Sequence, residues 1–206
     1  MKSIYVALTC RNCGYQTHKQ SETLILSDFE PYLKKQLIDE TYFSAICPCC
    51  KNKIDFLHHC LFVEKKYRYI LFIKAKHDQK ATDHLLYQEK AYCKRYVDNT
   101  TKIKETMKIL EDGYDDRAIA IMKLKLLLHL RKQEKHPVCI TYFDSEKEQS
   151  SIWFKVKTEE GEEMMAVHMQ IYDNILNILP KDDHEHYQNI DLEWAIQFQK
   201  KNLKQK

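Results

Sequence analysis

Four cysteines form two pairs in which two residues separate the thiols. The first pair is Cys10 and Cys13, and the second is Cys47 and Cys50. Two intervening residues let both sulfur atoms approach one cation from a tight turn, and two such turns complete a tetrahedral four-thiolate site of the kind that holds structural zinc. Four protein ligands leave no coordination position for a substrate. The pattern therefore predicts a structural Zn²⁺ centre and indicates no catalytic residue.

Other interpretations of the same four cysteines stay open. A rubredoxin-like iron centre uses the same ligands and similar spacing, so Fe is the alternative cofactor. A redox dithiol is less favoured, because a catalytic Cys-x-x-Cys usually opens a helix in a βαβ setting and occurs once. A chain without metal is the last alternative. Cys49 lies between two predicted ligands, but register with Pro48 favours Cys47 and Cys50 as the pair.

The remaining cysteines and a histidine pair indicate no second metal site. Cys60, Cys93 and Cys139 are predicted to be buried thiols, which pack as small apolar groups. His58 and His59 are adjacent, and adjacent residues of a strand point to opposite faces, so the two rings are not expected to chelate one ion.

Two further clusters of titratable residues have a structural explanation. Asp115 and Asp116 resemble a catalytic acid pair, yet carboxylates at a helix start complement its exposed amides and dipole. His184 and His186 are expected in a solvated loop between two helices, with a weak transition-metal site as the alternative.

Composition narrows the class of protein. The 206 residues carry 33 Lys and Arg against 30 Asp and Glu, and the net charge of +3 permits a nucleic-acid partner without requiring one. Three glycines provide no glycine-rich phosphate loop, which excludes Walker and dinucleotide-binding motifs. The apolar run 4–8 is too short for a secretory signal, and no run is long enough to span a membrane. We expect a cytoplasmic protein whose eight cysteines are ligands or thiols.

Short apolar runs predict the elements that position the cysteines. Strands are expected in one sheet at residues 3–9, 22–27, 54–57, 61–63 and 67–73, with 42–46 leading into the second cysteine pair. A helix between the two pairs is predicted from a cap at Asp28, Pro31 in its first turn, and Leu33, Leu37 and Ile38 on one face. This order predicts a zinc-ribbon-like antiparallel sheet with an inserted helix.

The second half of the chain predicts a helical and β region. One helix is expected to end at Gly113, and a largely buried helix to run from about Asp115 to Leu130. Strands at 138–143, 151–156 and 164–169 and two short closing helices at 171–179 and 192–198 follow. The fold class is α+β. The predicted domains are a zinc-ribbon-like domain at 1–75, a connecting segment at 76–98 and a mixed α+β region at 99–206.

The cysteine pairs and the segments around them resemble the bacterial CpXC-domain proteins. The likeness covers most of the chain, through residues 10–13, 47–50, 66–70, 95–98, 104–109 and 115–119. The family is named after its cysteine pairs, and the resemblance implies a zinc site and no assigned activity. Arg11 stands where the family name calls for proline, which removes a rigid ring from the turn but no ligand.

We expect a structural zinc-binding protein that acts as an interaction module, with another protein as the favoured partner. One alternative is a nucleic-acid-binding zinc ribbon, for which Lys65, Lys66, Tyr67, Arg68 and Tyr69 offer stacking and phosphate contacts. Strand alternation would separate the tyrosines from the arginine, which weighs against that surface. The other alternative is an enzyme with a cleft between the metal domain and the C-terminal region. The pattern points to no membrane partner and specifies no oligomeric state.

Overall fold

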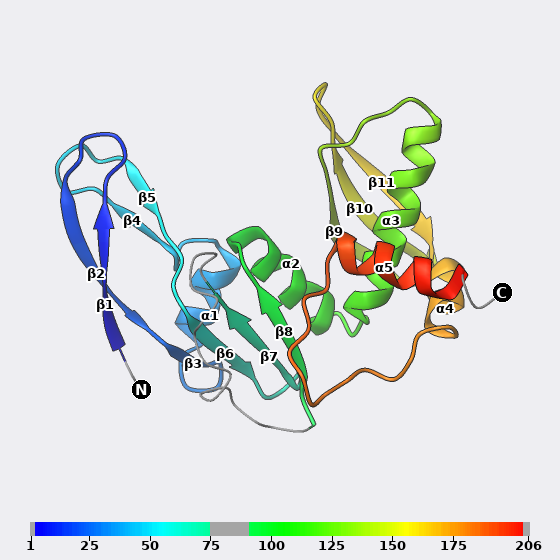
Figure 1. Ribbon diagram of the computed structural model, residues 1–206, viewed down its shortest axis with the longest axis horizontal. Coiled ribbons are helices and arrows are strands. Elements are labelled where there is room, and N and C mark those ends of the chain that lie inside the picture. The colour runs from blue at the N-terminus through cyan, green and yellow to red at the C-terminus, as the bar shows by residue number, and fades with distance from the viewer. Residues whose placement is uncertain (1–2, 75–90, 204–206) are drawn as a thin grey trace. The chain divides into compact units, whose positions relative to one another are not determined.

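A computed structural model describes residues 3–74 and 91–203 of the chain (Figure 1). It divides into two compact units, the first comprising Met1–Met107 with Asp182–Gln188 and the second Lys108–Lys181 with Asn189–Lys206. Both units combine helices with β-sheets, so the predicted α+β class is confirmed. Most of the predicted connecting segment 76–98 lies outside the described residues, and the predicted domain ranges stay a prediction.

Two hairpins in the first unit form a ribbon. Strand β1 (Ser3–Thr9) pairs antiparallel with β2 (Gln16–Glu22), and β4 (Ser44–Ile46) pairs antiparallel with β5 (Lys53–Asp55). The hairpins lie side by side (Figure 1), and each hairpin loop carries one cysteine pair. The predicted zinc-ribbon-like architecture is confirmed. The sequence analysis missed most of β2, because its residues are polar and mostly exposed or half-buried.

A separate four-stranded sheet follows in the order β3 (Leu24–Leu26), β6 (Cys60–Glu64), β7 (Tyr69–Ile73) and β8 (Cys93–Val97). Strands β6 and β7 pair antiparallel, whereas β3–β6 and β7–β8 pair parallel. All five residues of β7 are buried, as is typical of a strand covered on both faces. The prediction that the later strands extend the ribbon sheet is therefore wrong, because apolar runs indicate strands but not their partners.

Helix α1 (Pro31–Ile38) lies between the two hairpins in the sequence, as predicted. It buries Leu33 and Leu37 and begins at Pro31, whose fixed φ suits the first turn. The predicted cap at Asp28 is wrong, because the N-cap residue is Glu30. The Glu30 carboxylate instead accepts a hydrogen bond from the Leu26 amide at 3.3 Å.

Helix α2 (Thr100–Glu111) begins in the first unit, and its last residues belong to the second. The chain then turns at Gly113, which has a φ of 83° and ends the helical run as predicted. Among the described residues, no helix is long and apolar enough to cross a membrane.

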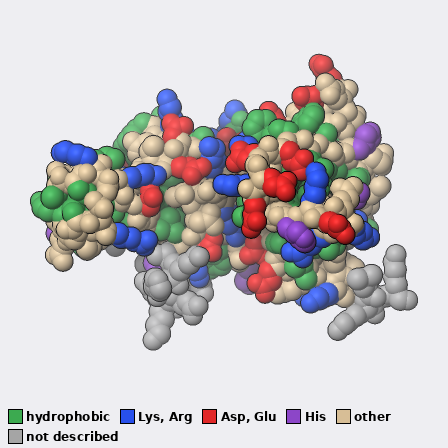
Figure 2. Space-filling view, turned by 90° about the horizontal axis from the view of Figure 1, so that it is seen from above, with side chains coloured by type: hydrophobic (Ala, Val, Ile, Leu, Met, Phe, Trp, Pro, Cys, Tyr) green, Lys and Arg blue, Asp and Glu red, His purple; other side chains and the backbone are tan. Residues whose placement is uncertain are grey.

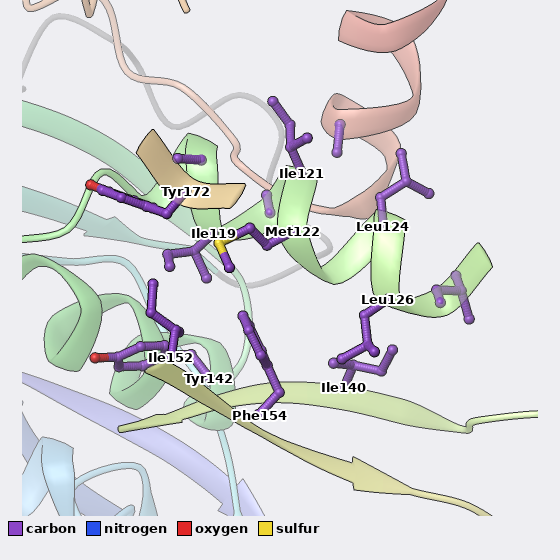
Figure 3. Close-up of a cluster of buried hydrophobic side chains, with 14 of the residues drawn as sticks. Ile119, Ile121, Met122, Leu124, Leu126, Ile140, Tyr142, Ile152, Phe154 and Tyr172 are labelled. Atoms are coloured by element: carbon purple, nitrogen blue, oxygen red, sulfur yellow. The ribbon is translucent and has the colours of Figure 1, made fainter. Parts of the chain in front are cut away.

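The second unit packs a buried helix against an antiparallel sheet of three strands. Helix α3 (Asp116–Lys132) buries most of its apolar residues, as its sequence predicts. Figure 3 shows Ile119 and Met122 of α3 facing Ile152 and Phe154 of the sheet. The other elements are β9 (Cys139–Glu146), β10 (Ser151–Lys157), β11 (Glu162–His168), α4 (Met169–Leu176) and α5 (Leu192–Leu203).

Candidate metal centre

The two hairpin loops bring the four predicted ligands together. The sulfur atoms of Cys10, Cys13, Cys47 and Cys50 all lie within 4.8 Å of one another. The closest contacts join the two loops, at 3.5 Å between Cys10 and Cys50 and 3.6 Å between Cys13 and Cys47. A tetrahedral zinc with Zn–S bonds of about 2.3 Å separates its sulfurs by about 3.8 Å, whereas a disulfide bond is about 2.05 Å. The four sulfurs are therefore placed to hold one metal ion.

The first loop folds into a knuckle through two backbone hydrogen bonds. The Cys10 amide donates to the Tyr15 carbonyl at 2.9 Å, and the Gly14 amide donates to the Cys10 carbonyl at 2.8 Å. The turn requires a φ of 71° at Gly14, a conformation that glycine adopts without steric cost. The turn directs the two thiols of the pair toward the second hairpin.

The second loop repeats the same bonds. The Cys47 amide donates to the Asn52 carbonyl at 2.8 Å, and the Lys51 amide donates to the Cys47 carbonyl at 3.0 Å. Lys51 occupies the place of Gly14 and has a φ of 62°. The cysteine spacing, and not the identity of the turn residue, is thus what the two knuckles share.

The two cysteines of each pair differ in burial. Cys10 and Cys47 are 2% and 0% exposed and belong to a small hydrophobic cluster with Leu8 and Ile54. Cys50 is half-buried, and Cys13 is exposed. Figure 2 shows hydrophobic side chains, a colour that includes cysteine, beside Lys and Arg at the ribbon end of the first unit. An ion held here is anchored in the ribbon interior on one side and lies near solvent on the other.

Hydrogen bonds and desolvation give the thiols of Cys50 and Cys13 different pKa values. The Asn52 amide, with help from the Asn12 side chain, lowers the pKa of Cys50 to about 6. The Tyr15 amide favours a thiolate at Cys13, but desolvation and the neighbouring sulfurs outweigh it and raise the pKa of Cys13 to about 12. Sulfurs this close cannot all carry a negative charge without a cation. Because a metal ion binds thiolates, it would replace the protons they share.

Lys19 of β2 forms a second connection between the two hairpins. Its ammonium donates to the carbonyls of Tyr42 at 2.7 Å and Ser44 at 2.6 Å, and it lies 5.2 Å from the centroid of the Phe56 ring. Desolvation lowers the pKa of Lys19. The sequence analysis did not identify this contact, since no sequence pattern marks a lysine that binds backbone carbonyls.

His58 and Cys60 lie outside the cysteine cluster. His58 is buried, with Nε2 2.7 Å from Ser21 Oγ and Nδ1 2.9 Å from the His59 carbonyl oxygen. Cys60 is buried, as predicted. In the part of the chain that the structure describes, the four ribbon cysteines are the one group of His, Cys, Asp and Glu placed to hold a metal ion.

The other cysteines differ in exposure. Cys93 is half-buried and Cys49 is exposed. The prediction that Cys139 is buried is wrong: it is exposed as the first residue of β9, at the edge of its sheet.

Asp115 and Asp116 lie at the start of α3. The Asp115 carboxylate accepts the Arg117 amide at 2.9 Å and pairs with the Arg117 guanidinium at 2.6 Å, and Asp116 is buried in the first turn. These contacts are the capping role that the sequence predicts.

His184 and His186 lie in the loop before α5. The His184 carbonyl accepts a hydrogen bond from Lys94 Nζ at 2.7 Å. The His186 ring is 2.8 Å from the exposed carboxylate of Asp183. The structure does not bring either histidine to the cysteine cluster.

The ribbon and its four convergent thiols define a module able to hold a metal ion. A family model described as CpXC protein matches residues 8–123, more than half of the chain. The chain therefore belongs to the CpXC family, as its resemblance implied. The matched range includes both cysteine pairs and extends into α3. Searches of the curated proteins and of the solved structures found no match.

Proposed function

We propose that the four cysteines hold one structural zinc ion and that the metal-held ribbon belongs to an interaction module for another macromolecule. The observation that carries the zinc assignment is the sulfur arrangement, with all four atoms within 4.8 Å. Four thiolates saturate tetrahedral zinc, so the ion contributes folding energy and no open position for catalysis. Iron remains the alternative ion, because it accepts the same ligands.

The ribbon has a structural need for the ion. Its fully buried hydrophobic cluster consists of Leu8, Cys10, Cys47 and Ile54, and two of these are ligands. Isolated two-stranded hairpins are at best marginally stable in water, whereas a structural zinc site contributes about 10–16 kcal/mol of binding energy. The ion therefore takes the place of a larger core.

Exposed apolar side chains on the ribbon support a role in binding. Tyr5 is 74% exposed, Ile46 is 63% exposed and Tyr15 is 46% exposed. Such side chains can contribute apolar contact area to a partner where they lie together in a patch. The balanced charge admits either a protein or a nucleic acid as partner. We place the protein in the cytoplasm, where a reducing environment keeps thiol ligands available for metal.

Metal analysis of the purified chain and of two serine variants tests this proposal. Cys47→Ser removes a buried ligand and should lose the metal and the hydrogen-exchange protection of both hairpins. Cys49→Ser is the matched control, because Cys49 is adjacent in sequence but exposed and outside the cluster. It should retain one zinc per chain. Full protection in Cys47→Ser, or equal metal loss in both variants, would refute the assignment.

A further inference from the structure

The start of α1 and the turn between β6 and β7 present aromatic rings and lysines on one surface of the first unit. We call it the aromatic–basic surface, and it consists of Phe29, Lys34, Lys65, Lys66 and Tyr67. Phe29 is 70% exposed and Tyr67 is 37% exposed. Exposed ring faces next to lysines can stack on bases while the lysines contact phosphates.

Contacts between lysines and rings hold this surface together. Lys65 Nζ lies 5.7 Å from the centroid of the Phe29 ring, which joins the turn to the start of α1. Lys66 Nζ and Lys34 Nζ lie 4.7 Å and 5.6 Å from the centroid of Tyr67. Cation–π attraction orders these flexible side chains, so less conformational entropy is lost when they meet an anion.

The surface keeps a positive charge. Lys34 Nζ pairs with the buried carboxylate of Glu64 at 2.7 Å, which neutralises the acidic residue next to the turn. Lys65 lies 3.7 Å from the Asp28 carboxylate, a long and partly exposed contact. A hydrogen bond with Tyr67 raises the pKa of Lys66, so this side chain stays protonated at neutral pH. Arg68 adds a further cation to the same turn.

We propose that the aromatic–basic surface binds single-stranded nucleic acid. Phe29 stacks on a base, Lys65 and Lys66 contact phosphates, and Tyr67 positions Lys34 and Lys66. Single-stranded binding uses this combination of ring faces and cations, and it requires no particular base sequence. This inference names the partner of the proposed interaction module, so it rests on the proposed function.

Two other anionic partners fit the surface less well. An acidic peptide would pair with the lysines but would leave the exposed ring of Phe29 without a matching group. A nucleic-acid duplex would offer phosphates, but its bases are stacked on one another and present no open face to an aromatic ring. The combination of an open ring face with neighbouring cations therefore favours a single-stranded nucleic acid.

Strand alternation was expected to place the tyrosines and Arg68 on opposite faces, and the geometry removes this objection. Residues 65–68 form a turn, so Tyr67 and Arg68 are not alternating residues of a strand. Tyr69 is the first residue of β7 and is 0% exposed, so it takes no part in the surface. The other ring is that of Phe29, just before α1, which the sequence analysis did not connect with this turn.

Fluorescence anisotropy of a labelled dT12 and a labelled rU12 oligonucleotide, titrated with the zinc-loaded full chain at low salt, tests the inference. We expect saturable binding. The logarithm of the association constant should fall by about 0.7 per phosphate contact for each tenfold rise in salt concentration. Lys65→Glu with Lys66→Glu should abolish binding. Phe29→Ala should weaken it by at least about fivefold. These side chains are exposed, so thermal unfolding should stay close to that of the parent.

Matched controls separate this surface from general charge and exposed aromatics. Phe143→Ala removes an exposed ring of β9, and Lys125→Glu with Lys147→Glu makes the same charge change on exposed residues of the second unit. All should bind both oligonucleotides as the parent does. Equal loss in these controls, or no anisotropy change at low salt, would overturn the inference.

Competing probes complete the test. A glutamate dodecapeptide or a duplex that displaces dT12 at equal concentration would assign the surface to that partner and refute the single-strand assignment. A purified chain that binds the oligonucleotides but contains no zinc would refute only the proposed zinc site. Zinc-loaded chain that binds no oligonucleotide would refute only this inference.

Discussion

Arg95 and Asp182 form a buried ion pair between residues separated by 87 positions in the sequence, with Nη2 2.8 Å from Oδ2. Asp182 lies in a segment, residues 182–188, in which the chain returns to the first unit. The Tyr96 amide donates to the Gln188 carbonyl at 2.8 Å, and the Gln188 amide donates to the Lys94 carbonyl at 3.1 Å. Residues 182–188 therefore cover the edge of the four-stranded sheet at β8, which would otherwise present unpaired backbone groups.

Removing the carboxylate of this pair should destabilise the first unit. Asp182→Ala removes from the Arg95 guanidinium, which is 2% exposed, a partner carboxylate that is 13% exposed. Loss of one partner of a buried pair typically costs about 3–5 kcal/mol. Hydrogen exchange of the β8 amides should accelerate accordingly. Asp183→Ala is the control, because Asp183 is exposed and pairs with an exposed histidine. Equal protection of β8 in the two variants would contradict this role of Asp182.

His58 should make the first unit less stable in mild acid. Burial lowers the pKa of His58 below the unfolded value of 6.5, so the unfolded chain binds the proton more readily. Its contribution to stability is complete above pH 6.5 and is lost as the pH falls from there toward the folded-state pKa, by at most about 1.4 kcal/mol per pH unit. We expect the stability difference between the parent and His58→Gln to shrink over this range.

Stability measured between pH 5.5 and 8 at constant metal content tests this expectation. Subtracting the variant removes the acid sensitivity of the cysteine site, which both proteins share. Glutamine is the suitable replacement because its side-chain amide can hydrogen-bond with Ser21 Oγ, which lies 2.7 Å from His58 Nε2, without titrating. A difference that stays constant across pH would rule out His58 as the source.

The two knuckles provide a matched pair of turn substitutions. A Cβ at Gly14 would meet no heavy atom within 4 Å, so the cost of Gly14→Ala comes from its φ of 71° and not from crowding. That conformation costs a residue with a side chain about 1–2 kcal/mol, which should weaken zinc binding roughly 5- to 30-fold. Lys51→Gly removes the same cost in the second knuckle, partly offset by the greater freedom of glycine when unfolded. Chelator competition measures both, and tighter binding by Gly14→Ala would contradict the turn argument.

Local sequence predicts local structure well in this chain. Helix α3 follows directly from its apolar residues and from Asp115 as cap, and α2 ends at Glu111, just before the turn at Gly113, as expected. The spacing of Cys10, Cys13, Cys47 and Cys50 indicates their convergence, because the turn that each pair requires is itself local. These features depend on periodicity and turn chemistry within a few residues.

Long-range pairing accounts for the features that the sequence analysis missed. The parallel pairing of Leu24–Leu26 with β6 and the return of residues 182–188 to β8 join segments that carry no mutual sequence signal. The strand β2 is polar because the ribbon covers little of its surface. The turn at residues 65–68 has the composition of a strand end. Only the structure shows that Tyr67 of this turn lies beside Lys34 of α1.

Zinc K-edge X-ray absorption on the purified chain tests the central claim most directly, because it reports the type, number and distance of the ligand atoms. Four sulfur neighbours at about 2.3 Å and no nitrogen or oxygen neighbour are the predicted result. A shell with fewer than four sulfurs, an added light ligand, or an iron edge in place of zinc would contradict a saturated zinc centre made by Cys10, Cys13, Cys47 and Cys50.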